Sequence, residues 1–147
     1  MRIAVGSDHA GFEAPGPAYK PAIVEYLETH GHAVVDCGTS GPEAVDYPDF
    51  AQKVSEAILQ DKADCGVLLC GTGIGMAIAA NRHKGIRAAT CANPEMAELA
   101  RSHNNANVIC LGRRILSLER CLKLIDIFLS TPFSEADRHK RRVAKLG

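Results

Sequence analysis

The sequence is poor in aromatic residues: tryptophan is absent from its 147 residues, and phenylalanine, tyrosine and tryptophan together make up 5%. Without large rings, a buried core has to be built mainly from Val, Ile, Leu and Ala. Such a core favours a sheet covered by helices over an aromatic-rich all-β barrel. The chain is long enough to bury a substantial core, and its length predicts a single domain over residues 1–147.

The sequence also lacks a net charge, because 17 basic residues balance 17 acidic ones. No overall field is available to attract nucleic acid or an acidic membrane, so we expect neither as a partner. The distribution is less even. Basic residues crowd the last ten positions, which is where we expect an anion to bind: Arg138, Lys140, Arg141, Arg142 and Lys145.

Long apolar runs and closely paired cysteines are both absent. The first apolar run breaks at Gly6, too early for a signal peptide or for a membrane span of about 20 residues. The six cysteines form no C-x-x-C pair, and Cys65 and Cys70 bracket one predicted strand. Five steps of about 3.3 Å separate these two by roughly 16 Å, too far for a disulfide. We therefore expect a cytoplasmic protein with reduced cysteines.

Short apolar runs alternate with helical patterns along the chain. The runs have the length of buried strands and cover residues 3–5, 33–35, 67–70, 88–91 and 108–111. Helical periodicity appears at residues 23–30, 50–58 and 118–129. The alternation predicts a parallel sheet with helices on both faces, joined by right-handed crossovers.

Helix starts are marked by Asp46 with Pro48, by Asn93 with Pro94, and by Ser117.

Two segments do not fit the alternation of strands and helices. Residues 13–21 contain three prolines and predict a surface loop before the first helix. Residues 134–146 predict a final helix with a Ser134–Asp137 capping box. Its apolar stripe is thin, so we expect it to reach another subunit.

Ligands of open parallel sheets bind beyond the carboxyl ends of the strands. Polar or reactive residues follow four of the predicted strands: Ser7 to Gly11, Cys70 to Gly75, Asn93, and Gly112 to Arg114. We expect them to gather at one edge of the sheet. Asp8 and His9 are candidate ligand-binding residues there, with a solvated turn as the alternative.

The strongest local signal is Cys70-Gly71-Thr72-Gly73-Ile74-Gly75, between a strand and a helix. Alternate glycines let backbone N–H groups converge on an anion, although a turn needed for tight packing is the alternative. Met76 stands where a dinucleotide motif needs glycine and where a cysteine phosphatase needs arginine, and the loop has no Walker ending. At the mouth of such a loop Cys70 is favoured as a thiolate, able to act as a base or nucleophile, whereas we assign the other five cysteines to the core.

His103 lies at the predicted end of a helix, next to Asn104, and is suited to proton transfer near neutral pH. A core position is the alternative for this histidine. Arg138 and Arg142 share one helix face and could hold a phosphate, although such a charged face is often only solvated. The remaining histidines, His30, His32, His83 and His139, are expected to be structural or exposed. No His, Cys or acidic cluster has metal-site spacing, so we expect no metal.

These motifs together resemble the ribose-5-phosphate isomerase B family, which includes galactose- and allose-6-phosphate isomerases. The resemblance covers nearly the whole chain and rests on Gly6–Phe12, Asp46–Asp49, Cys70–Gly75, Ala79–Asn81, Gly85–Ala88, His103–Asn107 and Arg138-His139-x-x-Arg142. It implies a Rossmann-like three-layer α/β/α fold with a five-stranded parallel sheet and a C-terminal helix. It also implies a homodimer, in some members paired into tetramers, with active sites at the subunit interface and no cofactor.

The resemblance further implies roles for single residues. Cys70 resembles the base that moves a proton between C2 and C1, and His103 resembles the group that opens the sugar ring. Thr72 and the amides of Gly71, Thr72, Gly73, Ile74 and Gly75 resemble the anion hole for the enediolate. Sugar hydroxyls would be held by Asp8 and Asn104, and sugar or phosphate by His9, Arg114, Arg138 and Arg142, the last two from the partner. One branch of the family has Glu at the position of Met76, so Cys70 assigns this chain to the cysteine branch.

The sequence therefore predicts an isomerase that interconverts ribose 5-phosphate and ribulose 5-phosphate through a cis-enediolate, in the pentose phosphate pathway. Three alternatives stay open: an isomerase of allose or galactose 6-phosphate, a non-catalytic phosphosugar-binding module, and a cysteine phosphatase. The proline-rich residues 13–21 are longer than the corresponding family segment and follow the Asp8 turn closely, so they bear on the shape of the pocket.

Overall fold

The computed structural model describes all 147 residues. Its elements follow in the order β1 (Arg2–Ser7), η1 (His9–Phe12, a short 3-10 helix), α1 (Tyr19–Thr29), β2 (Ala33–Asp36), α2 (Tyr47–Leu59), β3 (Cys65–Cys70), α3 (Ile74–Ala80), β4 (Ala88–Thr90), α4 (Pro94–Ser102), β5 (Val108–Gly112), α5 (Leu118–Ser130) and α6 (Asp137–Ala144). The five predicted strands are all present, with ends shifted by one or two residues.

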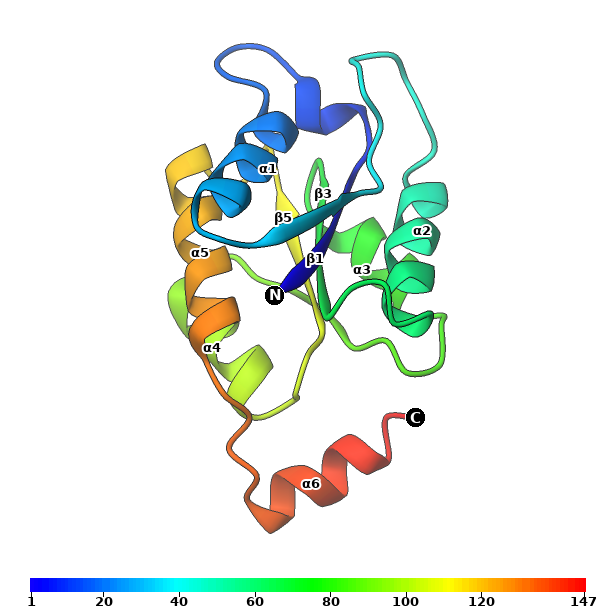
Figure 1. The fold of residues 1–147 in the computed structure, drawn as a ribbon, viewed down its shortest axis with the longest axis vertical. Coiled ribbons are helices and arrows are strands. Elements are labelled where there is room, and N and C mark those ends of the chain that lie inside the picture. The colour runs from blue at the N-terminus through cyan, green and yellow to red at the C-terminus, as the bar shows by residue number, and fades with distance from the viewer.

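The strands form one sheet in the order β2-β1-β3-β5-β4, and every pair is parallel. Helices α1, α4 and α5 cover one face, and α2 and α3 cover the other (Figure 1). The predicted three-layer α/β/α fold with a five-stranded parallel sheet is thus confirmed. None of the helices combines the length and the apolar character needed to cross a membrane.

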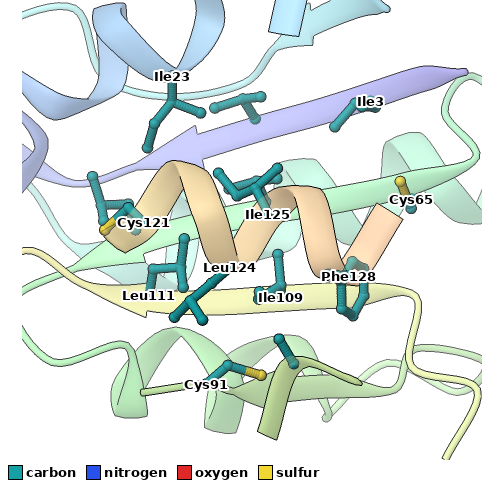
Figure 2. Close-up of a cluster of buried hydrophobic side chains, with 14 of the residues drawn as sticks. Ile3, Ile23, Cys65, Cys91, Ile109, Leu111, Cys121, Leu124, Ile125 and Phe128 are labelled. Atoms are coloured by element: carbon teal, nitrogen blue, oxygen red, sulfur yellow. The ribbon is translucent and has the colours of Figure 1, made fainter. Parts of the chain in front are cut away.

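The core consists of two aliphatic clusters, one on each face of the sheet. Alternate residues of a strand belong to opposite clusters: Ile3 and Val5 face α1 and α5, whereas Ala4 faces α2. Figure 2 shows α5 laid over the sheet, with Leu124, Ile125 and Phe128 directed at the strands. Both faces of the central strands β1, β3 and β5 are buried, which explains why these strands appear in the sequence as continuous apolar runs, whereas the edge strands β2 and β4 are half-buried or exposed.

The helix starts partly follow the prediction. The side chains of Asn93 and Ser117 accept hydrogen bonds, at 2.9 and 3.2 Å, from the backbone N–H groups of the third residues of α4 and α5, Met96 and Arg120. Asp46 precedes α2 but makes no side-chain cap. The expected loop over residues 13–21 is too long, because α1 already begins at Tyr19. Pro21 fits in its first turn, where backbone N–H groups have no intrahelical acceptor.

The final helix differs more from the prediction. α6 begins at Asp137 and the expected capping box does not form, because the Ser134 hydroxyl is paired with the His139 ring instead, at 2.6 Å. His139 is the only buried residue of α6. The helix lies apart from the three layers, at the end of the molecule where the strands begin (Figure 1).

Candidate active site

Cys70 is the last residue of β3, where the glycine-rich loop to α3 begins. Its side chain is 5% exposed, and its Sγ accepts a hydrogen bond from the backbone N–H of Gly73 at 3.1 Å. Gly73 has a φ of +81°, a conformation that side chains other than glycine rarely adopt. The loop is therefore folded back onto the sulfur by a residue that has to be glycine.

The same loop presents free hydrogen-bond donors. The backbone N–H groups of Gly71, Thr72 and Gly75 find no acceptor within the protein. The Thr72 hydroxyl oxygen accepts from the N–H of Ile74 at 3.3 Å, so its own proton is available to a ligand. This arrangement suits an anion held beside the Cys70 thiol.

The turn after β1 supplies the next two side chains. The Asp8 N–H donates to the carbonyl of Leu69 at 3.3 Å, which ties the turn to β3. The Asp8 carboxylate accepts a hydrogen bond from the N–H of Ala10 at 2.9 Å and so caps the N-terminus of η1. The Nδ1 of His9 accepts from the N–H of Val45 at 3.2 Å. A neutral His9 therefore carries its proton on Nε2, which can donate to a ligand.

Arg114 follows β5 and is held by the start of the proline-rich segment, residues 13–15. The Glu13 carboxylate binds the guanidinium through Nε, at 3.1 Å, and through Nη2. Hydrogen bonding to Arg114 holds the pKa of Glu13 below its usual value. Arg113 secures the same segment, because its guanidinium donates to the carbonyls of Glu13 and Pro15 at 3.0 and 2.7 Å. Residues 13–15 are thus fixed at the rim of the site.

These side chains line one cleft of about 510 Å³ at the carboxyl ends of the strands: Asp8, His9, Tyr47, Cys70, Gly71, Thr72, Ile74, Gly75, Ile78 and Arg114. Two of the lining residues, Tyr47 and Ile78, were not among those expected from the sequence. Tyr47 is the first residue of α2, and α2 is the element that follows β2. The rule that ligands bind beyond the carboxyl ends of parallel strands could therefore also have indicated Tyr47. A Cβ at Gly75 would lie 2.8 Å from the Tyr47 ring, so glycine lets that ring approach the loop.

Four expected site residues lie elsewhere. His103 and Asn104 follow α4, which runs antiparallel to the strands, so they emerge at the opposite edge of the sheet. Asn104 lines a second cleft, of about 430 Å³, together with Arg87, Ala88 and Leu146. Arg138 and Arg142 lie on α6 at that same end, exposed and without an acidic partner. Residues that directly follow strands, such as Asp8, Cys70 and Arg114, thus lie together at one edge of the sheet as expected, whereas these four, which follow or lie on helices, lie at the other edge of the same chain.

His139 was expected to be structural or exposed, with no cluster around it. It is buried and structural, but it does not stand alone, because its ring packs on that of His103 with centroids 4.2 Å apart. The N–H of Ser134 also donates to the carbonyl of Ser102, at 3.0 Å. These contacts join the start of α6 to the end of α4 and place Arg138, His103 and Asn104 in one neighbourhood.

The other five cysteines are free thiols that burial keeps protonated. It raises the pKa of Cys65, Cys91 and Cys121 to about 11, that of Cys110 well above the ordinary value, and that of Cys37 to a smaller extent. Cys37 is only half-buried, but it packs against the core cluster on the face covered by α2 and α3. None of the five lines the cleft, and Cys70 is the only thiol there.

Known proteins share this arrangement over the full chain. A family described as Ribose/Galactose Isomerase matches residues 3–146. The chain is 42% identical to ribose-5-phosphate isomerase B of Escherichia coli, over 99% of this chain and 93% of that protein. A crystal structure of a ribose 5-phosphate isomerase from Thermotoga maritima is 52% identical, has a TM-score of 0.92, and is matched over 99% of this chain and 96% of that one.

A second solved structure gives the same result. Ribose-5-phosphate isomerase B of Clostridium thermocellum is 45% identical, with a TM-score of 0.94 over 100% of this chain and 95% of that one. The fold and the length of the chain thus agree with one group of enzymes. The chain belongs to the ribose/galactose isomerase family.

Proposed function

We propose that this protein is an aldose–ketose isomerase that interconverts ribose 5-phosphate and ribulose 5-phosphate without a cofactor, in the pentose phosphate pathway of the cytoplasm. The observation that carries the proposal is the Cys70 thiol, placed in a cleft beside three free backbone N–H donors. Proton abstraction next to a carbonyl needs this pair of elements, a base and preorganised donors for the developing oxyanion. The substrate is that named for the Escherichia coli and Thermotoga maritima relatives.

In the proposed reaction, the Cys70 thiolate removes the proton from C2 of the open-chain aldose and returns it to C1. The proton of the C2 hydroxyl moves to the oxygen on C1, so that the aldehyde becomes a hydroxyl and C2 becomes the ketone. The negative charge passes to the carbonyl oxygen as the enediolate forms, and the N–H groups of Gly71, Thr72 and Gly75 then stabilise it. The Thr72 hydroxyl adds a further donor. Asp8 would hold sugar hydroxyls, whereas His9 and Arg114 would position the sugar or its phosphate at the rim.

We further propose that the active sites are shared between two subunits of a homodimer. The residues suited to ring opening and phosphate binding, His103, Arg138 and Arg142, lie at the edge of the sheet opposite Cys70. In a two-fold dimer, that edge of one chain can face the cleft of the other. Exposed apolar side chains beside the cleft, Ile74 and Ile78 on α3, favour a contact there. Asn104 would then reach the sugar from the partner side.

The test is an isomerase assay on the purified protein with ribose 5-phosphate, allose 6-phosphate and galactose 6-phosphate at equal concentrations. We expect the highest kcat/KM for ribose 5-phosphate. Faster turnover of a six-carbon sugar would assign the physiological substrate to that sugar instead. Binding of these sugar phosphates without any turnover would leave a phosphosugar-binding protein, and phosphate release from an aryl phosphate would indicate a phosphatase.

A further inference from the structure

Lys20 is a buried charged residue that the proposed reaction does not use. It is the second residue of α1, at the end of the proline-rich segment, and its side chain is only 7% exposed. Lysine is almost never this buried unless its ammonium group is paired. Here Nζ forms an ion pair with the carboxylate of Asp36, the last residue of β2, whose side chain is 46% exposed.

Two glycines make room for the lysine side chain. A Cβ at Gly11 would lie 3.0 Å from Cβ of Lys20 and 2.6 Å from the Ser7 hydroxyl. A Cβ at Gly38 would lie 3.0 Å from Cε of Lys20 and 2.9 Å from the backbone nitrogen of Ser7. The lysine stem therefore runs between η1 and the loop after β2, and both backbones touch it. Ser7 is fully buried between the same two glycines.

Asp36 and Ser7 connect this packing to the cleft. The second carboxylate oxygen of Asp36 accepts from the N–H of Gly38 at 3.0 Å, and the carbonyl of Ser7 accepts from the N–H of Thr39 at 3.0 Å. The loop that begins here continues to Val45, whose N–H donates to His9. Ser7 itself is followed directly by Asp8. One ion pair thus supports both the turn that carries Asp8 and His9 and the loop that fixes the ring of His9.

We propose that Lys20 is a positioning residue: its ion pair with Asp36 holds the Asp8–His9 turn in the geometry that binds the substrate. This inference rests on the proposed function for its kinetic consequences. Cys70 and its loop lie on β3 and make no hydrogen bond with Lys20 or Asp36, so the base should be unaffected.

The kinetic test uses Lys20→Met, which keeps the length of the stem and removes the charge. We expect KM for ribose 5-phosphate to rise about tenfold or more, because small displacements of positioned groups cost up to about a hundredfold. kcat should change less than about threefold, as expected when binding alone is lost. The alkylation rate of Cys70 by iodoacetamide, followed by peptide mapping, should stay as in wild type. Lys62→Met, on an exposed lysine, is the matched control. An unchanged KM would overturn the inference.

A second arm does not depend on activity. Nitrogen-15 NMR of the histidine rings reports which nitrogen of His9 is protonated, and the wild-type contact with Val45 fixes the Nε2–H form. We expect Lys20→Met and Asp36→Asn each to give a mixture of tautomers at His9. Asp36→Asn changes a half-exposed side chain and serves if Lys20→Met does not fold. The double variant should be no worse than the poorer single variant, because both remove one interaction. Unchanged His9 signals in Asp36→Asn would contradict the inference even if the protein proved not to be an isomerase.

Discussion

His103 and His139 pack ring against ring, with centroids 4.2 Å apart, and this contact joins α6 to the end of α4. His139 is also bonded to Ser134 and is buried, whereas the rest of α6 is half-buried or exposed. The helix that carries Arg138 and Arg142 is therefore anchored at one histidine. Its position should depend on the charge of that histidine.

The first prediction concerns pH. Burial, and then the charges of His103, Arg138 and Arg142, lower the pKa of His139 from its usual value of 6.5. Below pH 6.5 the free helix takes up a proton that the docked helix excludes, so docking is strongest above this pH and weakens as the pH falls. We expect the amides of residues 137–144 to lose hydrogen-exchange protection between pH 7.5 and 5.5. His139→Phe keeps an aromatic ring but has no titrating group, so hydrogen-exchange protection of α6 should no longer depend on pH in this variant. If protection is still lost at low pH in His139→Phe, another group is responsible for the pH dependence.

The second prediction concerns Glu13 and Arg114. Their hydrogen bonds lower the pKa of Glu13, so the stabilisation is complete above its usual value of 4.5 and is lost as the pH falls through the lower folded value. The effect on stability should stay below about 1 kcal/mol, because Arg114 is largely exposed. Glu13→Gln should lower Tm slightly at pH 7 and hardly at all at pH 2. The control is Glu25→Gln, at an exposed glutamate without an ion pair, which should leave Tm unchanged at both pH values. Equal losses at both pH values would show that charge is not responsible.

The third prediction tests the base. Cys70→Ala should lower turnover of ribose 5-phosphate by roughly 10²–10⁴-fold, the usual effect of losing a general base. Its circular dichroism and phosphate binding should remain, because the substitution removes only the sulfur atom of one buried side chain. Iodoacetamide should inactivate the wild-type enzyme, and substrate should protect it. Cys37→Ala, which removes a half-buried thiol outside the cleft, is the control. Turnover above about a hundredth of wild type in Cys70→Ala would exclude the assignment.

The fourth prediction tests ring opening by His103. His103→Asn should reduce turnover of cyclic ribose 5-phosphate far more than turnover of an acyclic four-carbon aldose phosphate, which has no ring to open. General acid–base assistance is typically worth about 10²–10⁴-fold, so the two substrates should separate clearly. The comparison is made on kcat with both substrates at saturation. If His103→Asn lowers kcat equally for both substrates, His103 does not open the sugar ring.

The fifth prediction tests whether sites are shared. Cys70 and Arg142 lie at opposite edges of the sheet, so Cys70→Ala and Arg142→Ala should damage different halves of each proposed site. If the protein is the proposed dimer, unfolding and refolding a mixture of the two variants should form heterodimers with one intact site. Activity should recover to about a quarter of wild type per total site, as random pairing in a two-fold dimer requires. Mixtures that exchange subunits, as native mass spectrometry would show, yet remain inactive would place each site within one chain.

The sequence by itself predicted the sheet and most of the residues of the cleft. The alternation of apolar runs and helical periods defines a parallel sheet, because each parallel strand needs a crossover before the next. Once the strands are parallel, their carboxyl ends meet, and residues that directly follow them are brought together whatever their distance in sequence. Asp8, Cys70 and Arg114 could be placed for this reason. The free N–H groups of the loop also follow from its glycines.

Only the tertiary structure decided the rest. His103 ends a helix, and helices of this fold run antiparallel to the strands, so it lies at the edge opposite Cys70. The Ser134 hydroxyl pairs with His139, five residues later, in place of the expected capping box, and His139 in turn is held by the ring of His103 at the end of α4. Lys20 looked like a surface residue in a proline-rich stretch, yet it is buried because Asp36, 16 residues later, supplies its counter-charge. Local patterns determine which elements form, whereas the partners of polar side chains depend on how those elements pack.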